Sequence, residues 1–184
     1  MKSLTILRHA KSGWDATVER DFDRPINLRG RRGAEIIGQW LKRQSLPIDA
    51  VVASPAVRVT ETLDIFLPTA GLEATPSSFD RRIYLASAAT LMDVIRETGS
   101  DIDHLLIAGH NPGLEDLILM LVPESPSDDL RAKVDEKLPT AALARLELPI
   151  ENWQDLDSGI ARFADFIRPR DLDSSLSPAM DHDD

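Results

Sequence analysis

The stretch Leu4-Thr5-Ile6-Leu7-Arg8-His9 decides the expected fold, because an apolar run ends abruptly in a cation and an imidazole. A short apolar run bounded by polar residues is typical of a buried strand. Such a strand rarely ends in an arginine and a histidine unless that end faces a ligand. We therefore expect a strand over residues 3–8 with a ligand site at its carboxyl end.

Two further apolar runs end in a similar way. Residues 105–108 lead through a glycine into His110, and residues 50–53 lead into a Ser-Pro pair, with Arg58 a few residues on. In an open parallel sheet the carboxyl ends of the strands share one edge, where α/β proteins bind ligands. Two guanidinium groups and two imidazoles would converge at that edge, and this set suits a phosphoryl group.

The remaining pattern alternates strands with helices around these runs. Strands are expected over 3–8, 49–53, 104–108, 142–148 and 161–167, and helices over 29–44, 56–67, 88–97 and 114–121. We expect Ser54 to cap the second helix, Pro68 and Gly71 to end it, and residues 123–129 to form a loop. The order predicts an α/β fold, a three-layer α/β/α sandwich with a mostly parallel central sheet.

Length and composition exclude several classes of protein. A chain of 184 residues, 42% of them hydrophobic, predicts one domain with a full core. We expect a domain over 1–170 and a disordered acidic tail over 171–184, where five aspartates meet no lysine or arginine. The net charge of -10 argues against nucleic-acid binding, and no apolar run reaches the roughly 18 residues of a membrane span.

The chain has no cysteine, which excludes disulfides, thiolate metal sites and a cysteine nucleophile. The first strand begins at once, leaving no room for a signal peptide, so we expect a cytoplasmic protein. The four histidines show no His-x-x-x-His or similar spacing, so we expect no metal site and no cofactor.

The expected chemistry is a histidine attack on phosphorus. His9 must then be neutral, and the neighbouring Arg8 and Arg58 disfavour its imidazolium form by like-charge repulsion. The attack would form a phosphohistidine intermediate that water hydrolyses. Arg8 and Arg58 present planar forks of donors to phosphate, His110 would donate to a phosphoryl oxygen, and helix starts after Ser54 and Asn111 would add free N–H groups.

Each of these residues also has a structural interpretation. Arg8 could be a solvated strand end, His9 a hydrogen-bonded core histidine, and His110 part of a turn. Arg58 could pair with Glu61 on its own helix. The remaining cations of this region are most simply a solvated basic face: Lys11, Arg29, Arg31, Arg32, Lys42 and Arg43. The joint placement at strand ends favours a site.

Three motifs in order resemble the histidine phosphatase superfamily. Leu7-Arg8-His9-Ala10 resembles its Arg-His-Gly signature, residues 54–62 its second-arginine segment, and residues 109–112 its second-histidine segment. Asp23-Arg24-Pro25-Ile26-Asn27, Tyr84-Leu85-Ala86 and residues 138–142 are similar to the short SixA-type branch, which is associated with phosphohistidine phosphatase activity. The resemblance covers residues 1 to 170 and implies a phosphoglycerate mutase-like fold.

The resemblance implies that His9 is the nucleophile, that Arg8 and Arg58 bind phosphate, and that His110 completes the pocket. One feature departs from the family. Larger members carry a glutamate as general acid near the position of Arg82-Ile83-Tyr84, where this chain has no carboxylate. The possible substitutes are Asp15, Asp21, Asp23 and Glu115.

A missing acid favours a phosphohistidine substrate. An alkoxide leaving group needs a proton donor, whereas a phosphoramidate leaves as neutral imidazole once it is protonated. We therefore expect a metal-independent phosphatase acting on a phosphohistidine-bearing signalling protein. The alternatives are a phosphomonoesterase for a small metabolite and a catalytically idle module that binds a phosphorylated partner. A phosphoglycerate mutase is the least favoured, because the acid and the enclosing insertions are absent.

Overall fold

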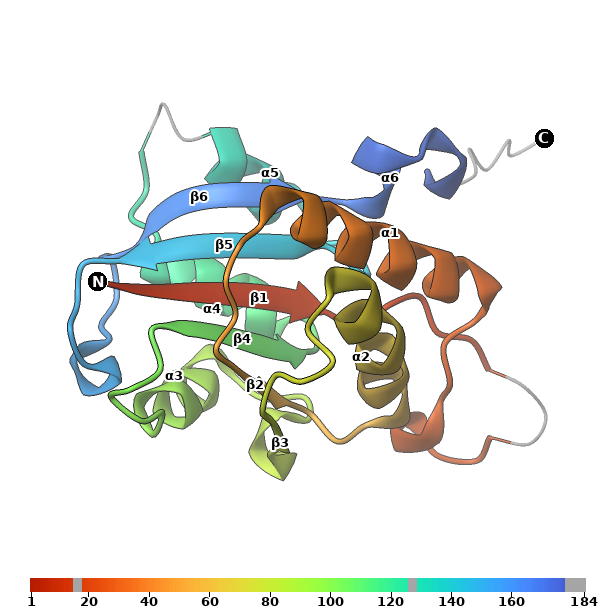
Figure 1. The fold of residues 1–184 in the computed structure, drawn as a ribbon, viewed down its shortest axis with the longest axis horizontal. Coiled ribbons are helices and arrows are strands. Elements are labelled where there is room, and N and C mark those ends of the chain that lie inside the picture. The colour runs from red at the N-terminus through yellow and green to blue at the C-terminus, as the bar shows by residue number, and fades with distance from the viewer. Residues whose placement is uncertain (15–17, 126–128, 178–184) are drawn as a thin grey trace.

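The computed structural model describes residues 1–14, 18–125 and 129–177 and contains one mixed sheet (Figure 1). The strands, in the spatial order β3-β2-β4-β1-β5-β6, are β1 (Lys2–Arg8), β2 (Ala50–Ala53), β3 (Ser77–Phe79), β4 (His104–Gly109), β5 (Leu143–Leu148) and β6 (Arg162–Ile167). The helices are α1 (Leu28–Gln44), α2 (Val57–Ala70), α3 (Ala88–Arg96), α4 (Gly113–Leu121), α5 (Asp129–Glu136) and α6 (Pro169–Leu172). Short 3-10 turns cover Asp21–Asp23, Arg81–Ile83, Trp153–Asp155 and Ser174–Leu176.

The central strand β1 lies between β4 and β5. It pairs in parallel with β4, with Arg8 opposite Gly109, and antiparallel with β5. β2 joins β4 and β3 in parallel, whereas β6 pairs antiparallel with β5. The prediction of a mostly parallel sheet is confirmed. Because Arg8 pairs with Gly109, the residues that follow them, His9 and His110, lie at the same edge of the sheet.

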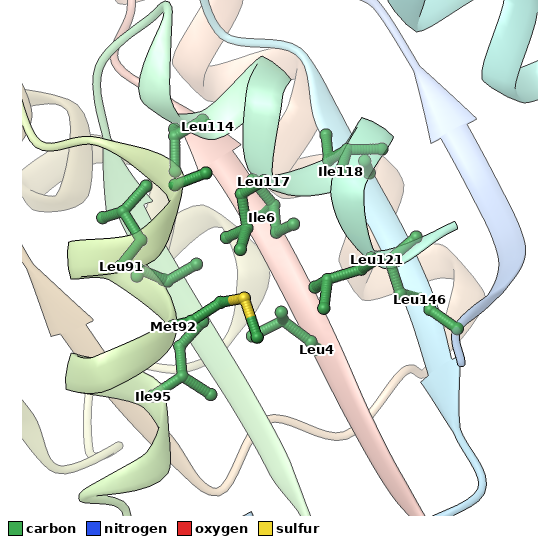
Figure 2. Packing of buried hydrophobic residues seen from close by; sticks show 14 of the residues in the cluster. Leu4, Ile6, Leu91, Met92, Ile95, Leu114, Leu117, Ile118, Leu121 and Leu146 are labelled. Carbon is green, nitrogen blue, oxygen red and sulfur yellow. The ribbon is translucent and has the colours of Figure 1, made fainter. Parts of the chain in front are cut away.

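Helices cover both faces of the sheet. Successive residues of a strand point to opposite faces, so Ile6 packs with α3 and α4 whereas Leu7 packs with α1 and α2. Figure 2 shows the first of these clusters, with Leu4 and Ile6 under Leu91 of α3 and Leu117 of α4. The predicted three-layer α/β/α sandwich is therefore confirmed.

The start of helix α2 differs from the prediction. The cap is Ala56, whose side chain has no hydroxyl to satisfy the first N–H groups, and Ser54 lies outside the helix. The helix also continues through Pro68 to Ala70 and ends at Gly71, which has a φ of 75°. Proline has a helical φ, and near a helix end it removes one hydrogen bond only, which burial of Phe66 and Ala70 offsets.

Besides the short helix α6 and the 3-10 turns, two elements were not predicted. The edge strand β3 has three exposed residues, so it carries no alternation of buried and exposed side chains. Helix α5 begins at Asp129, where the sequence predicts the end of a loop, and the single buried residue of this helix is Val134. An element that buries one side chain leaves almost no periodic signal in the sequence.

The predicted tail is ordered at its start, contrary to expectation. Arg168 forms a capping box with Asp171, and Leu172 packs against the cluster between the sheet and α1. Arg29 of α1 donates hydrogen bonds to the carbonyl oxygens of Leu176 and Ser177. These contacts hold residues 171–177, whereas residues 178–184 of the predicted tail lie outside the described residues.

Among the described parts of the chain, none of the helices is both long and apolar enough to span a membrane.

Gly30, in the first turn of α1, packs directly on the backbone that follows β1. A Cβ atom there would lie 2.2 Å from the carbonyl oxygen of Lys11, whereas a Cβ at Gly33 would meet Ala141 at an ordinary 3.4 Å. Gly30→Ala should lower the free energy of unfolding by about 1–3 kcal/mol through overpacking. Gly33→Ala, the matched control, should be neutral or stabilising by up to about 1 kcal/mol from helix propensity.

Urea unfolding of both variants provides the measurement. Equal stability of the two alanine variants would contradict the close approach of α1 to Lys11.

Candidate active site

The two predicted histidines lie side by side at the edge of the sheet. His9 follows β1 and His110 follows β4, and their ring centroids are 5.3 Å apart. The His9 amide donates a hydrogen bond to the Gly109 carbonyl at 3.1 Å, which extends the strand pairing past the sheet. The parallel register therefore brings these two side chains together.

His9 is 7% exposed, and its Nδ1 lies 2.8 Å from the carbonyl oxygen of Ala10. A carbonyl oxygen only accepts hydrogen bonds, so Nδ1 carries the proton and Nε2 keeps its lone pair. Burial lowers the pKa of His9 to about 3, and the charges of Arg8 and Arg58 act in the same direction. The expected repulsion by the arginines is present, but desolvation is the larger cause.

His110 has one bonded and one unbonded ring nitrogen. Its Nε2 lies 2.8 Å from the hydroxyl of Ser54, whereas its Nδ1 is buried without a hydrogen-bond partner. Burial, followed by the charge of Arg58, lowers the pKa of His110 to about 4. Ser54 was expected to cap a helix, and the structure instead makes it the partner of His110.

Arg58 is 2% exposed and is held by Asp21. One of its terminal nitrogens donates to the Asp21 carbonyl at 2.6 Å and the other to the Asp21 carboxylate at 2.9 Å. The Tyr84 hydroxyl donates to the same carboxylate oxygen at 2.7 Å. Burial by itself would raise the pKa of Asp21, but these hydrogen bonds and the charge of Arg58 outweigh it and lower the pKa.

Arg8 is positioned through the peptide group of Leu138. Its terminal nitrogen donates to the Leu138 carbonyl at 2.7 Å, and the Leu138 amide donates to Glu115 at 2.8 Å. Asn111 donates to both the Leu138 carbonyl and Glu115, each at 3.0 Å. The sequence showed Glu115 as a possible acid, and its position is that of a structural acceptor.

Three buried nitrogen atoms of this cluster have no hydrogen-bond partner among the described residues: Arg8 Nε, Arg58 Nε and His110 Nδ1. An unsatisfied buried donor costs about 1–3 kcal/mol, so such groups are rare unless a ligand or water satisfies them. An anion with several acceptor oxygens, placed beside His9, would satisfy them together. The arrangement can therefore bind a phosphoryl group and present a neutral imidazole nitrogen to it.

The contacts of the described residues test the structural alternative for Arg58 and the remaining acid candidates. Arg58 pairs with Asp21, whereas Glu61 accepts a hydrogen bond from the amide of Ile26 at 2.8 Å. Asp23 pairs with Arg20 on the surface. The last acid candidate, Asp15, lies outside the described residues.

The second expected helix start also differs from the prediction. Helix α4 begins at Gly113 after Pro112, and the Asn111 side chain donates hydrogen bonds to Leu138 and Glu115 instead of capping the helix.

The sequence analysis did not predict the ion pair between Arg58 and Asp21, because the two residues are far apart in the chain and no local pattern joins them.

The chain is similar to proteins of one family. The family model of the histidine phosphatase superfamily (branch 1) matches residues 4–79. An uncharacterized protein of Mycobacterium tuberculosis is 34% identical over 165 residues, which cover 89% of this chain and all of that protein. An uncharacterized chloroplastic protein of Arabidopsis thaliana is 31% identical over 65% of this chain and 59% of its own length.

Several solved structures have the same fold as this chain. SixA from Agrobacterium tumefaciens is 27% identical, with a TM-score of 0.75 over 91% of this chain and 98% of that chain. SixA from Nakamurella multipartitia is 26% identical, with a TM-score of 0.78 over 91% of this chain and 96% of its own. The protein histidine phosphatase SixA with bound tungstate, at 22% identity, has a TM-score of 0.73 over 92% of this chain and 99% of its own, and shares the fold.

We expect both site histidines to stay neutral from pH 5 to pH 8, because burial lowers the pKa of His9 to about 3 and that of His110 to about 4. Nitrogen-15 spectra of ring-labelled protein should show no titration of either ring in that range and should assign the proton of His9 to Nδ1. A ring of either residue that titrates near pH 6.5 would contradict the arrangement.

The same shifts predict a stability change with a defined sign. Between pH 6.5 and about 4 the two histidines of the unfolded chain bind more protons than those of the folded chain. The free energy of unfolding is therefore highest above this window and falls as the pH is lowered through it. Replacing His110 with glutamine should make this acid loss shallower in urea unfolding at pH 7 and pH 5.

Proposed function

Since the chain belongs to the histidine phosphatase superfamily, we propose that His9 is its nucleophile and that its substrate is a phosphohistidine in a partner protein. The chain is a hydrolase of the phosphatase class. The observation that carries the proposal is the neutral His9 ring, whose Nδ1 is bonded to Ala10 and whose Nε2 keeps its lone pair, among buried donors that lack partners within the described residues. The activity would need no metal ion, because the guanidinium groups of Arg8 and Arg58 supply the positive charge.

In the first step, the lone pair of His9 Nε2 forms a bond to phosphorus while the bond from phosphorus to the substrate nitrogen breaks. The substrate ring enters with its other nitrogen protonated, so the electron pair of the broken bond becomes a lone pair on the leaving nitrogen and the ring departs as neutral imidazole. Arg8, Arg58 and His110 Nδ1 would donate to the three phosphoryl oxygens as charge is redistributed. For that donation the Ser54 hydroxyl donates its hydrogen bond to His110 Nε2, so that the ring proton of His110 is on Nδ1.

In the second step, a water oxygen attacks the phosphorus of the phosphohistidine enzyme. The bond from phosphorus to Nε2 breaks, the electron pair returns to the His9 ring, and the attacking water loses a proton to bulk solvent as inorganic phosphate leaves. Ala10 keeps the Nδ1 proton in place during both steps, so the same nitrogen is nucleophile and leaving group.

The carboxylates near the site favour a phosphoramidate substrate. Asp21 is held in its ionised form by Arg58 and Tyr84, and Glu115 accepts hydrogen bonds from Asn111 and Leu138. The lowered pKa of Asp21 leaves it no proton to donate at neutral pH, and the Glu115 carboxylate is occupied as an acceptor. General acid catalysis is typically worth about 100- to 10,000-fold for a poor leaving group. An imidazole leaving group depends less on such a donor than a sugar alkoxide does.

Similarity to the SixA proteins of Agrobacterium tumefaciens and Nakamurella multipartitia, which are described as phosphohistidine phosphatases, supports the same substrate class. A cytoplasmic location, inferred from the cysteine-free composition, belongs to this proposal.

The test is turnover of a phosphohistidine peptide, a phosphoaspartyl protein and a panel of sugar phosphates by one preparation in excess EDTA. The phosphohistidine peptide should have the highest kcat/KM, and rapid quench should trap an acid-labile phosphoenzyme. His9→Ala should abolish turnover and trapping. His104→Gln, at the opposite end of β4, is the control and should keep both.

A higher kcat/KM for a sugar phosphate would replace the proposed substrate with a metabolite. Retained turnover in His9→Ala would show that the nucleophile lies elsewhere.

Arg58→Ala should lower kcat/KM by a factor that corresponds to about 2–4 kcal/mol, because a charge-assisted, preorganised contact to the transferring group is lost. Arg58→Lys should recover only part of the activity, since a point charge cannot hold Asp21 and a phosphoryl oxygen at once. Rates are compared per folded molecule, with the melting temperature measured in parallel. Full activity in the lysine variant would exclude a role for the planar fork.

A further inference from the structure

A cavity of about 450 Å³ lies beside the proposed catalytic site, and we name it the basic pocket. Six of its lining residues are cations: Arg8, Lys11, Arg29, Lys137, Arg168 and Arg170. None of the described residues that line it is acidic, although the chain as a whole carries a net charge of -10. A concentration of positive charge in a hollow of an acidic protein points to an anionic ligand.

The basic pocket and the catalytic site share a border. Arg8 lines the pocket and precedes His9 in the chain. Residues 139–141 form another wall, and the Ala141 amide donates to the His9 carbonyl at 3.0 Å. A ligand in the pocket therefore lies next to the group that His9 would attack.

Several cations of the pocket have no hydrogen-bonded partner for their side chains in the part of the chain that the structure describes. Lys11, Lys137 and Arg170 form no side-chain hydrogen bond or ion pair within the described residues. Arg168 is the exception, because it binds Asp171 at 2.7 Å. Arg29 donates to backbone carbonyls, including that of Ser177 at 2.6 Å, and so keeps its full charge at the pocket.

The pocket is built by close backbone packing rather than by mobile side chains alone. The first turn of α1 rests on Lys11, whose carbonyl accepts from the Asn27 amide at 2.9 Å and leaves no room for a Cβ at Gly30. This packing sets Lys11 beside Arg29. The two were expected to belong to a solvated basic face, and both are exposed, as are Lys42 and Arg43 at the far end of α1; Lys11 and Arg29 differ from those two in that they also line the pocket.

We propose that the basic pocket binds a second anionic group of the substrate while the His9 site holds the phosphoryl group that is removed. This inference rests on the proposed function for the catalytic half of the site. Guanidinium and ammonium groups bind both phosphate and carboxylate oxygens. The second group is therefore either a carboxylate beside the phosphohistidine of a partner protein or a second phosphoryl group of a small molecule.

The experiment compares two matched pairs of substrates. The first pair is a phosphohistidine peptide with glutamates beside the modified residue and the same peptide with glutamines. The second pair is a sugar bisphosphate and the corresponding monophosphate. Each pair is assayed with the wild-type protein, with Lys137→Gln/Arg170→Gln, and with Lys42→Gln/Arg43→Gln, a control that removes the same charge from exposed positions away from the pocket.

The wild-type protein and the control should prefer the more anionic member of one pair by about tenfold in kcat/KM. The pocket variant should show a ratio near one. The pair that shows the preference identifies the source of the second anion. A preference that persists in the pocket variant, or its absence in both pairs, would overturn the inference.

Failure of the proposed function gives a different result. No turnover of either peptide would reject the phosphohistidine substrate, and the sugar pair would then decide the role of the pocket. If no substrate turns over, calorimetry with inorganic pyrophosphate decides it. Binding about tenfold weaker in the pocket variant than in the control supports the inference, and equal binding overturns it.

Discussion

The parallel register between β1 and β4 is the constraint on which the rest of the structure depends. It sets Arg8 opposite Gly109, so His9 and His110 leave the sheet at the same level and meet with ring centroids 5.3 Å apart. A shift of one residue would turn Ile6 and Leu7 to the wrong faces and expose both cores. The packing that stabilises the sheet therefore also fixes the geometry of the site.

Burial and positive charge act together on the two imidazoles. Desolvation is the larger cause of the low pKa of His9 and of His110, and neighbouring arginines add to it. The guanidinium of Arg58 would be costly in such a place without a partner, and Asp21 supplies one. The result is a pair of neutral rings in a positive field, a combination that suits attack on a phosphoryl group.

What a scaffold of this kind acts on depends on the segments around the strand ends rather than on the sheet. In this chain α1, residues 137–141 and the segment from Arg168 to Ser177 surround the basic pocket, so they are the places where substrate choice would be decided.

The sequence alone determined the order of the main elements, the mostly parallel sheet and the convergence of His9, His110, Arg8 and Arg58, because each follows from a buried run and the residue that ends it. It did not determine β3 or α5, which bury too little to leave a pattern. Only the tertiary structure decided that Asp21 holds Arg58, that Ser54 binds His110 and that Lys11 meets Arg29 at one pocket. Those contacts join segments far apart in the chain. Local periodicity predicts helices and strands, but it does not predict which polar side chains of distant segments come into contact.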